Sequence, residues 1–299
     1  MSLKLGQIAS AFKVCRFVTP GKPEEQEALI GVITDAGHVI DLGKARFETM
    51  TALINHDSPY ETLGSLEVGN SRTYDLPDVK ILCPIEAQKV WGAGVTYLKS
   101  RDEREAESGN PSFYYKVYEA LRPELFPKAD GDDGFYTRGP NELICVPSYS
   151  SITVSEPELV IVISSDGKII GYTIGNDITA TDIEGENPLY LPQAKTFEGC
   201  FSTGPYIVIG LSEEQIRQQE INLKIVRSTW WKVILPGGPP SREGIAVFRP
   251  SFLCAGKSST SKRRASTKSF PTKRSAPSLR RSAPVSRANL TSANCATTK

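Results

Sequence analysis

Glu156, Glu158 and Asp177 are the side chains whose type and spacing suggest chemistry. Glu156 and Glu158 stand two residues apart, so both point to the same face of a strand. If Asp166-Gly167 forms a two-residue hairpin turn, Asp177 lies opposite Glu156 and diagonal to Glu158. Like charges opposed across a ladder repel one another unless a cation lies between them. A divalent metal ion is the simplest such cation.

The three expected ligands all supply oxygen, and no His or Cys is near them in the sequence. Hard oxygen donors favour Mg²⁺, Mn²⁺ or Ca²⁺ over Zn²⁺ or copper. With only three protein ligands, an octahedral ion keeps positions for water or substrate, which suits catalysis better than a structural role. A solvated strand end that carries ordinary surface carboxylates is the alternative on these residues alone.

The hairpin that must position these carboxylates is built from two apolar, β-branched runs, Leu159–Ile163 and Ile169–Ile174. Further strands are expected at Ala11–Val18 and Ala28–Ile33, and helices at Phe47–Asn55, Ser112–Leu121 and, in a charged stretch, Lys99–Ser108. Many strands and few helices predict a β-rich α+β fold.

We expect a small N-terminal β-rich domain (1–83), a catalytic domain (84–256) and a basic tail (257–299) that is disordered because it has little to bury.

Charge and cysteine content restrict the class of protein. Eleven of the 35 Lys and Arg residues lie in the tail, which has no Asp or Glu, so residues 1–256 carry 24 basic against 34 acidic side chains. An acidic body argues against nucleic-acid binding. Six cysteines without a Cys-x-x-Cys pair indicate free thiols of a reducing compartment. Without a signal peptide or a long apolar run, the sequence predicts a cytoplasmic protein that does not associate with membranes.

Four motifs in the order of one known family carry a resemblance over roughly residues 84 to 227. They read "VWGAGVTY" (90–97), "RPELFPKA" (122–129), "EPELVIVI" (156–163) and "GYTIGNDITATDIEGENPLYLPQAKTFEGCFSTGP" (171–205). The sequence thus resembles the fumarylacetoacetate hydrolase family. Within it, "VYEALRPELFPKA" and "GENPLYLPQAK" are most similar to the branch that dehydrates 2-keto-3-deoxy pentonates. The resemblance implies a mixed β-roll for the catalytic domain and a homo-oligomer.

The resemblance also implies roles for six residues. Glu156, Glu158 and Asp177 match the ligands of a divalent ion, Mg²⁺ or else Mn²⁺ or Ca²⁺. Lys195 in "AKTFE" matches the family's lysine, and a metal ion beside it would lower its pKa toward the range of proton transfer; simple pairing with a carboxylate is the alternative.

Two further positions come from the dehydratase branch. Glu124 matches an acidic residue that would protonate the departing hydroxyl, with an exposed loop carboxylate as the alternative. Lys128 occupies a position that faces the substrate in the family, with an ordinary surface lysine as the alternative.

The predicted activity is a metal-dependent lyase that dehydrates a 2-keto-3-deoxy sugar acid, a small 2-oxo acid, to a 2,5-dioxo acid. A hydrolase or a decarboxylase of a 2-oxo acid from the same family is one alternative. The family's C–C hydrolases use a His after the "GxxY" segment to activate water, and this chain has no His after residue 56.

The resemblance ends after Arg227, where the family continues with core strands and a Thr-Gly-Thr loop. The remaining Ser-, Arg- and Pro-rich sequence is typical of a shifted reading frame. A truncated or frame-shifted, inactive family member is therefore the other alternative.

Overall fold

The computed structural model describes residues 3–21, 28–43, 46–86, 89–97, 111–131, 135–223 and 263–264. All of these belong to one compact unit, Met1–Thr267. The predicted charged helix Lys99–Ser108 lies outside the described residues. So do the departure from the family pattern after Arg227 and, apart from Arg263–Arg264, the tail 257–299.

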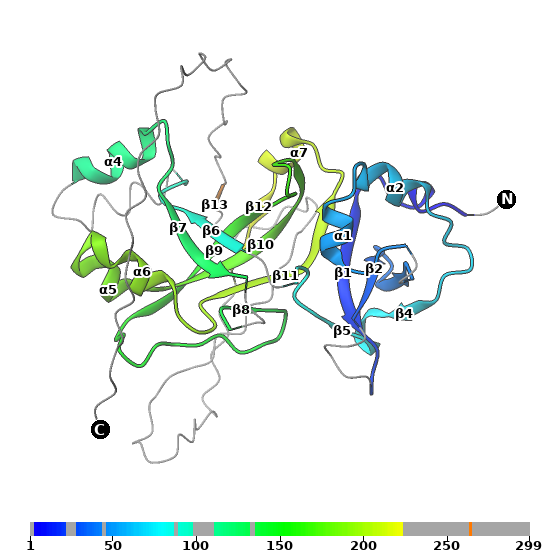
Figure 1. Ribbon diagram of the computed structural model, residues 1–299, viewed down its shortest axis with the longest axis horizontal. Coiled ribbons are helices and arrows are strands. Elements are labelled where there is room, and N and C mark those ends of the chain that lie inside the picture. Colours follow the sequence, from blue (N-terminus) through cyan, green and yellow to red (C-terminus); the bar gives the residue numbers. More distant parts are fainter. Residues whose placement is uncertain are drawn as a thin grey trace, which may run out of the picture. The chain divides into compact units, whose positions relative to one another are not determined.

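One large antiparallel sheet dominates the described part of the chain (Figure 1), and its strand order is β4-β3-β2-β1-β11-β10-β9. Two short strands join it at the side: β5 pairs with β1, and β8 pairs in parallel with β11. The strands of this sheet are β1 (Phe12–Val18), β2 (Leu29–Ile33), β3 (His38–Asp41), β4 (Thr73–Asp75), β5 (Lys80–Ile81), β8 (Thr137–Arg138), β9 (Thr153–Ile163), β10 (Ile169–Ala180) and β11 (Phe201–Ile209).

Two further ladders lie outside this sheet. They are β6 (Lys89–Ala93) with β7 (Leu125–Asp130), and β12 (Glu220–Ile221) with β13 (Arg263–Arg264). The described helices are short: η1 (Leu5–Gln7), α1 (Met50–Ile54), α2 (Pro59–Ser65), η2 (Leu76–Asp78), α4 (Pro111–Glu119), α5 (Thr181–Glu186), η3 (Pro188–Tyr190), α6 (Leu191–Lys195) and α7 (Glu213–Arg217). The predicted β-rich α+β class is confirmed. None of the helices in the described ranges is long and apolar enough to cross a membrane.

The predicted elements occur where the hydrophobic pattern placed them, with shifted ends. Observed β1 and β2 each begin one residue later than expected, whereas β9 and β10 extend well beyond their apolar runs. The helix expected at Phe47–Asn55 is shorter because Thr49 caps it: Thr49 Oγ1 accepts a hydrogen bond from the Ala52 N–H at 3.0 Å.

The hairpin turn differs from the expected one. Ser164 and Lys168 close the turn around three residues, with Gly167 at φ +82°, instead of the predicted two-residue turn. A bulge between Ile169 and Gly171 then shifts the register by one residue. The two departures cancel, so the strands beyond the bulge pair as the simple turn would have paired them.

The main core joins the two ends of the sheet. Leu5, Phe12 and Val14 share one buried cluster with Val162 and Ile207. Strand β1 also pairs directly with β11, for example Val14 with Ile207. Residues from both expected domains therefore contribute to one sheet and one core, and the division near residue 83 stays a prediction.

Candidate active site

The β9–β10 hairpin brings the three predicted carboxylates together. Asp177 is paired with Glu156, and Glu158 is paired with Gly175, two residues before Asp177. This register confirms the expectation that the three acids lie on one patch of the hairpin. Asp177 is 8% exposed, because β10 runs between β9 and β11.

Lys195, the last residue of α6, is 3% exposed, and its ammonium group contacts this patch. Its Nζ donates to Glu156 Oε2 at 2.9 Å and to Asp177 Oδ2 at 3.1 Å. It also donates to Thr179 Oγ1 at 2.7 Å and lies 4.0 Å from Glu184 Oε1. The structure therefore pairs Lys195 with the carboxylates, as its alternative role would, and its catalytic role stays a prediction.

The charges of the cluster shift two pKa values in the same direction. Burial, and then the negative charges of Asp177 and Glu156, raise the pKa of Glu158 from 4.5 to about 8. For Lys195, burial acts to lower the pKa, but the carboxylates of Asp177, Glu156 and Glu184 outweigh it, and the pKa lies above its ordinary value. The lowered pKa expected for this lysine is thus not what these contacts produce, because its nearest neighbours are anions.

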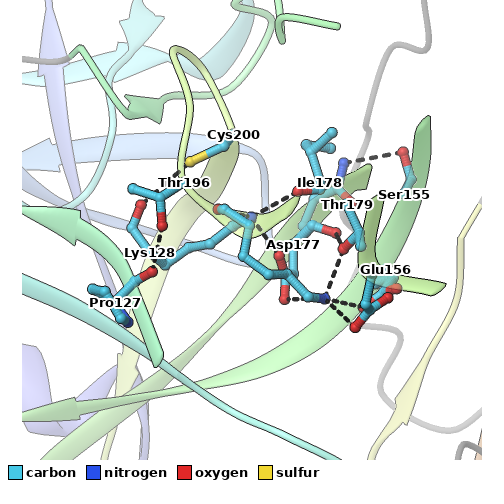
Figure 2. A network of polar contacts seen from close by, with 12 residues as sticks. Pro127, Lys128, Ser155, Glu156, Asp177, Ile178, Thr179, Thr196 and Cys200 are labelled. Carbon is cyan, nitrogen blue, oxygen red and sulfur yellow. Dashed lines mark hydrogen bonds and ion pairs between the residues drawn. The ribbon is translucent and has the colours of Figure 1, made fainter. Parts of the chain in front are cut away.

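Lys128 on β7 is the second buried lysine of the cluster, at 1% exposed. Its Nζ donates to the main-chain oxygens of Ile178 at 2.7 Å and Lys195 at 2.6 Å, and lies 2.5 Å from Asp177 Oδ1. In Figure 2, Lys128 and Glu156 approach Asp177 from opposite sides. The expected contact between Lys128 and a substrate does not agree with this arrangement, because its ammonium group faces protein acceptors.

Glu124 stands directly before β7 and is exposed. Its main-chain oxygen accepts a hydrogen bond from the Gly94 N–H at 3.0 Å, and its carboxylate lies where a side chain on Gly94 would otherwise be. Phe126, two residues further along the chain in β7, has its ring centre 5.3 Å from Lys195 Nζ. The structure thus places Glu124 beside Gly94, one residue before β7, and its catalytic role stays a prediction.

Sequence reasoning missed Thr179 and Glu184, which complete the surroundings of Lys195. Thr179 follows Asp177 by two residues on a strand, so its side chain shares the same face and could have been predicted. Glu184 lies on α5, and nothing in its spacing pointed to the site before the helix was seen to follow β10 directly (Figure 1).

A divalent ion fits the chemistry of this donor set. Glu156, Glu158, Asp177 and Glu184 are four acids around the two ammonium groups of Lys128 and Lys195. Burial raises the pKa of Glu158, and the negative charges of Asp177 and Glu156 raise it further. Among the described residues, no three acids, His or Cys are already spaced as ligands of one ion, and the Lys195 ammonium lies between Glu156 and Asp177.

Comparisons with known proteins agree with the fold and the motifs. No protein-family model matches the chain. It is 39% identical over 189 residues to the 2-dehydro-3-deoxy-D-arabinonate dehydratase of Saccharolobus solfataricus, over 60% of this chain and 62% of that protein. It is 46% identical over 144 residues to a protein of Haloferax volcanii named "probable 2-keto-3-deoxyxylonate dehydratase", over 48% of each chain.

A solved structure, a 2-keto-3-deoxy-D-arabinonate dehydratase complexed with magnesium and 2,5-dioxopentanoate, is 36% identical with a TM-score of 0.57, over 72% of both chains. The chain belongs to the fumarylacetoacetate hydrolase family. Within the family, the two sequence relatives given above both carry the names of dehydratases. The match covers only 62% and 48% of the lengths of the two sequence relatives.

Proposed function

We propose that the chain is a divalent-metal-dependent lyase that dehydrates a 2-keto-3-deoxy pentonate to 2,5-dioxopentanoate. The observation that carries the proposal is the pairing of Asp177 with Glu156 beside Glu158, on the hairpin that bears the family's motifs. A related dehydratase was solved as a complex with magnesium and 2,5-dioxopentanoate, which supports the choice of ion and product.

Glu156, Glu158 and Asp177 would hold the ion, with Mg²⁺ as the first choice for three carboxylates. A bound Mg²⁺ supplies a Lewis acid that polarises the 2-oxo group of the substrate and makes the protons on C3 more acidic. Carboxylates that hold an ion would also exert less of the attraction that keeps Lys195 protonated, so this lysine could lose its proton.

Lys195 would remove a proton from C3, and Glu124 would donate a proton to the C4 hydroxyl as it leaves. The C3–H and C4–O bonds break, a C3–C4 double bond forms, and one water molecule departs. A later proton shift from C5 to C3 converts the remaining allylic alcohol to an enol with a C4–C5 double bond. Transfer of the enol O–H proton to C4 then forms the C5 aldehyde and gives the 2,5-dioxo acid. Lys195 is 3% exposed and contacts the carboxylates through its Nζ, whereas Glu124 is exposed and lies one residue before β7.

The activity is tested by incubating the full chain with a 2-keto-3-deoxy pentonate and Mg²⁺. We expect 2,5-dioxopentanoate, detected by mass spectrometry after carbonyl derivatisation, and no product in the presence of EDTA. Lys195→Ala should reduce turnover at least 10²-fold, since general acid–base catalysis contributes about 10²–10⁴-fold. Lys89→Ala, at an exposed lysine of β6, is the matched control and should keep full turnover.

Cleavage of an acylpyruvate without dehydration of the pentonate would reject the lyase proposal in favour of a hydrolase of the same family. Loss of cooperative unfolding in the full chain, with no turnover of either substrate, would favour the truncated or frame-shifted alternative. A homo-oligomer and a cytoplasmic location stay predictions, to be checked by light scattering and by imaging.

A further inference from the structure

The ammonium group of Lys128 is buried and contacts oxygen atoms of the protein. A lysine ammonium has three N–H donors. Two of them meet the main-chain oxygens of Ile178 and Lys195, and the ammonium group also forms an ion pair with Asp177 Oδ1 at 2.5 Å. The Lys128 side chain is 1% exposed, and its ammonium group faces these protein oxygens.

These contacts join three elements that carry the site. Lys128 belongs to β7, Asp177 and Ile178 belong to β10, and Lys195 ends α6. The main chain of β7 is tied to the same region, because Thr196 Oγ1 donates to the Pro127 oxygen at 2.8 Å. The Cys200 thiol likewise donates to the Lys128 oxygen at 3.3 Å. The β7 strand is therefore fixed on both sides of the Lys128 side chain (Figure 2).

A buried cation is costly unless it is paired and hydrogen-bonded. Lys128 meets both conditions through Asp177 and the two carbonyl oxygens. The same contacts fix one oxygen of Asp177, so the other, Oδ2, is turned toward Lys195 Nζ at 3.1 Å. They also fix the main chain of Lys195 itself.

We propose that Lys128 is a positioning residue that orients Asp177 and Lys195, and that it does not bind the substrate. The inference deepens the proposed function, because the orientation of Asp177 sets how well the three carboxylates can hold an ion. Its central claim, that Lys128 acts through Asp177, needs neither metal nor turnover and can be tested without them.

The first test is a double-mutant cycle on stability in EDTA, with Lys128→Met, Asp177→Asn and the double variant. If Lys128 acts through Asp177, Lys128→Met should lower the Tm at least twice as much in the wild-type background as in the Asp177→Asn background. Lys168→Met is the control, since Lys168 pairs with an exposed acid, Asp166, and should leave the Tm within about 2 °C of wild type.

The second test is the affinity for Mg²⁺, measured by titration calorimetry without sugar acid. Partners that orient metal ligands typically contribute 10–100-fold to affinity. We therefore expect Lys128→Met to weaken binding at least tenfold, and Lys168→Met to have no effect. With saturating Mg²⁺ and a pentonate, kcat should fall while KM stays within about threefold.

Equal Tm losses in both backgrounds of the cycle would overturn the proposal. So would an unchanged Mg²⁺ affinity together with a raised KM, which is the result expected of a substrate ligand. If Lys128→Met alone does not fold, the double variant should fold, because it removes both charges of the pair; a double variant that also fails to fold contradicts the role through Asp177. Absence of any Mg²⁺ binding by the wild type would refute the proposed function but leave the cycle valid.

Discussion

At the residue scale, the site is governed by an imbalance of charge. Glu158 is the affected residue: burial, and then the charges of Asp177 and Glu156, raise its pKa to about 8. A hydrogen bond from Tyr97 and the charge of Lys195 oppose the rise but do not reverse it. Near neutral pH, Glu158 therefore holds a proton in the folded chain, and this reduces the negative charge of the cluster.

This pKa predicts a definite dependence on pH. Between pH 4.5 and about 8, the folded chain holds the proton of Glu158 and the unfolded chain does not. The contribution of Glu158 to stability is thus complete below pH 4.5 and is lost as the pH rises toward 8. The same proton competes with a metal ion, so the affinity for Mg²⁺ should rise roughly tenfold per unit between about pH 6 and 8.

Calorimetric titrations at several pH values measure this slope. Glu158→Gln should flatten it, whereas Glu186→Gln, at an exposed acid on α5, should leave it unchanged. An affinity that does not vary with pH in the wild type would show that Glu158 carries no proton in the folded chain.

At the scale of elements, the β9–β10 hairpin decides whether the acids meet. The sequence was enough to predict their register, although the reason for it was incomplete: the observed turn is one residue longer, and the bulge after Ile169 compensates. Turn length and bulges depend on local hydrogen bonds, here of Ser164 and Lys168, which apolar alternation does not specify. The contacts of Lys128 were beyond prediction for a similar reason, because they join β7, β10 and α6 through main-chain oxygens.

Gly171, beside the bulge, is required by the close approach of β11. A Cβ at this position would lie 2.6 Å from the Val208 carbonyl oxygen and 2.8 Å from Ile207 Cγ2. We expect Gly171→Ala to lower the free energy of unfolding by about 1–3 kcal/mol, because a backbone oxygen cannot move aside cheaply. Urea denaturation followed by circular dichroism measures the loss.

Gly185→Ala is the matched control. A Cβ there has nothing within 4 Å, and Ala favours a helix over Gly by roughly 1 kcal/mol, so this variant should be as stable as the wild type or slightly more stable. Equal destabilisation by both substitutions would mean that the packing of β10 on β11 is not the cause.

At the scale of the whole molecule, the sequence predicted the β-rich class. It did not predict that the expected N-terminal domain (1–83) and the expected catalytic domain (84–256) share one hydrophobic core. Hydrophobic alternation reveals a strand and its buried face, but not its neighbour in the sheet. The pairing of β1 with β11 joins residues almost 200 positions apart in the chain, and nothing local encodes it.

The shared core predicts that residues 84–299 do not fold as the full chain does. Without β1, the β11 edge is exposed, and Ile207 and Ile209 lose their partners Phe12 and Val14. We expect the truncated chain to aggregate, or to lose the cooperative thermal transition of the full chain. Light scattering and calorimetry of both chains provide the comparison. An unchanged melting transition would establish that residues 84–299 fold without the first 83 residues.

The strand order has a consequence for how the site opens. Asp177 lies on β10, an inner strand that is buried from Gly171 to Ala180, whereas Glu156 lies on β9, the last strand in the order within the described residues. Strands at an edge open locally at a lower free energy than inner strands, and their amides exchange with solvent sooner. Local opening of β9 would therefore separate the two carboxylates while the rest of the sheet stays folded. An ion bound by both carboxylates would stabilise β9 against this opening. The amides of β9 should then be the first to gain protection from exchange when the ion binds.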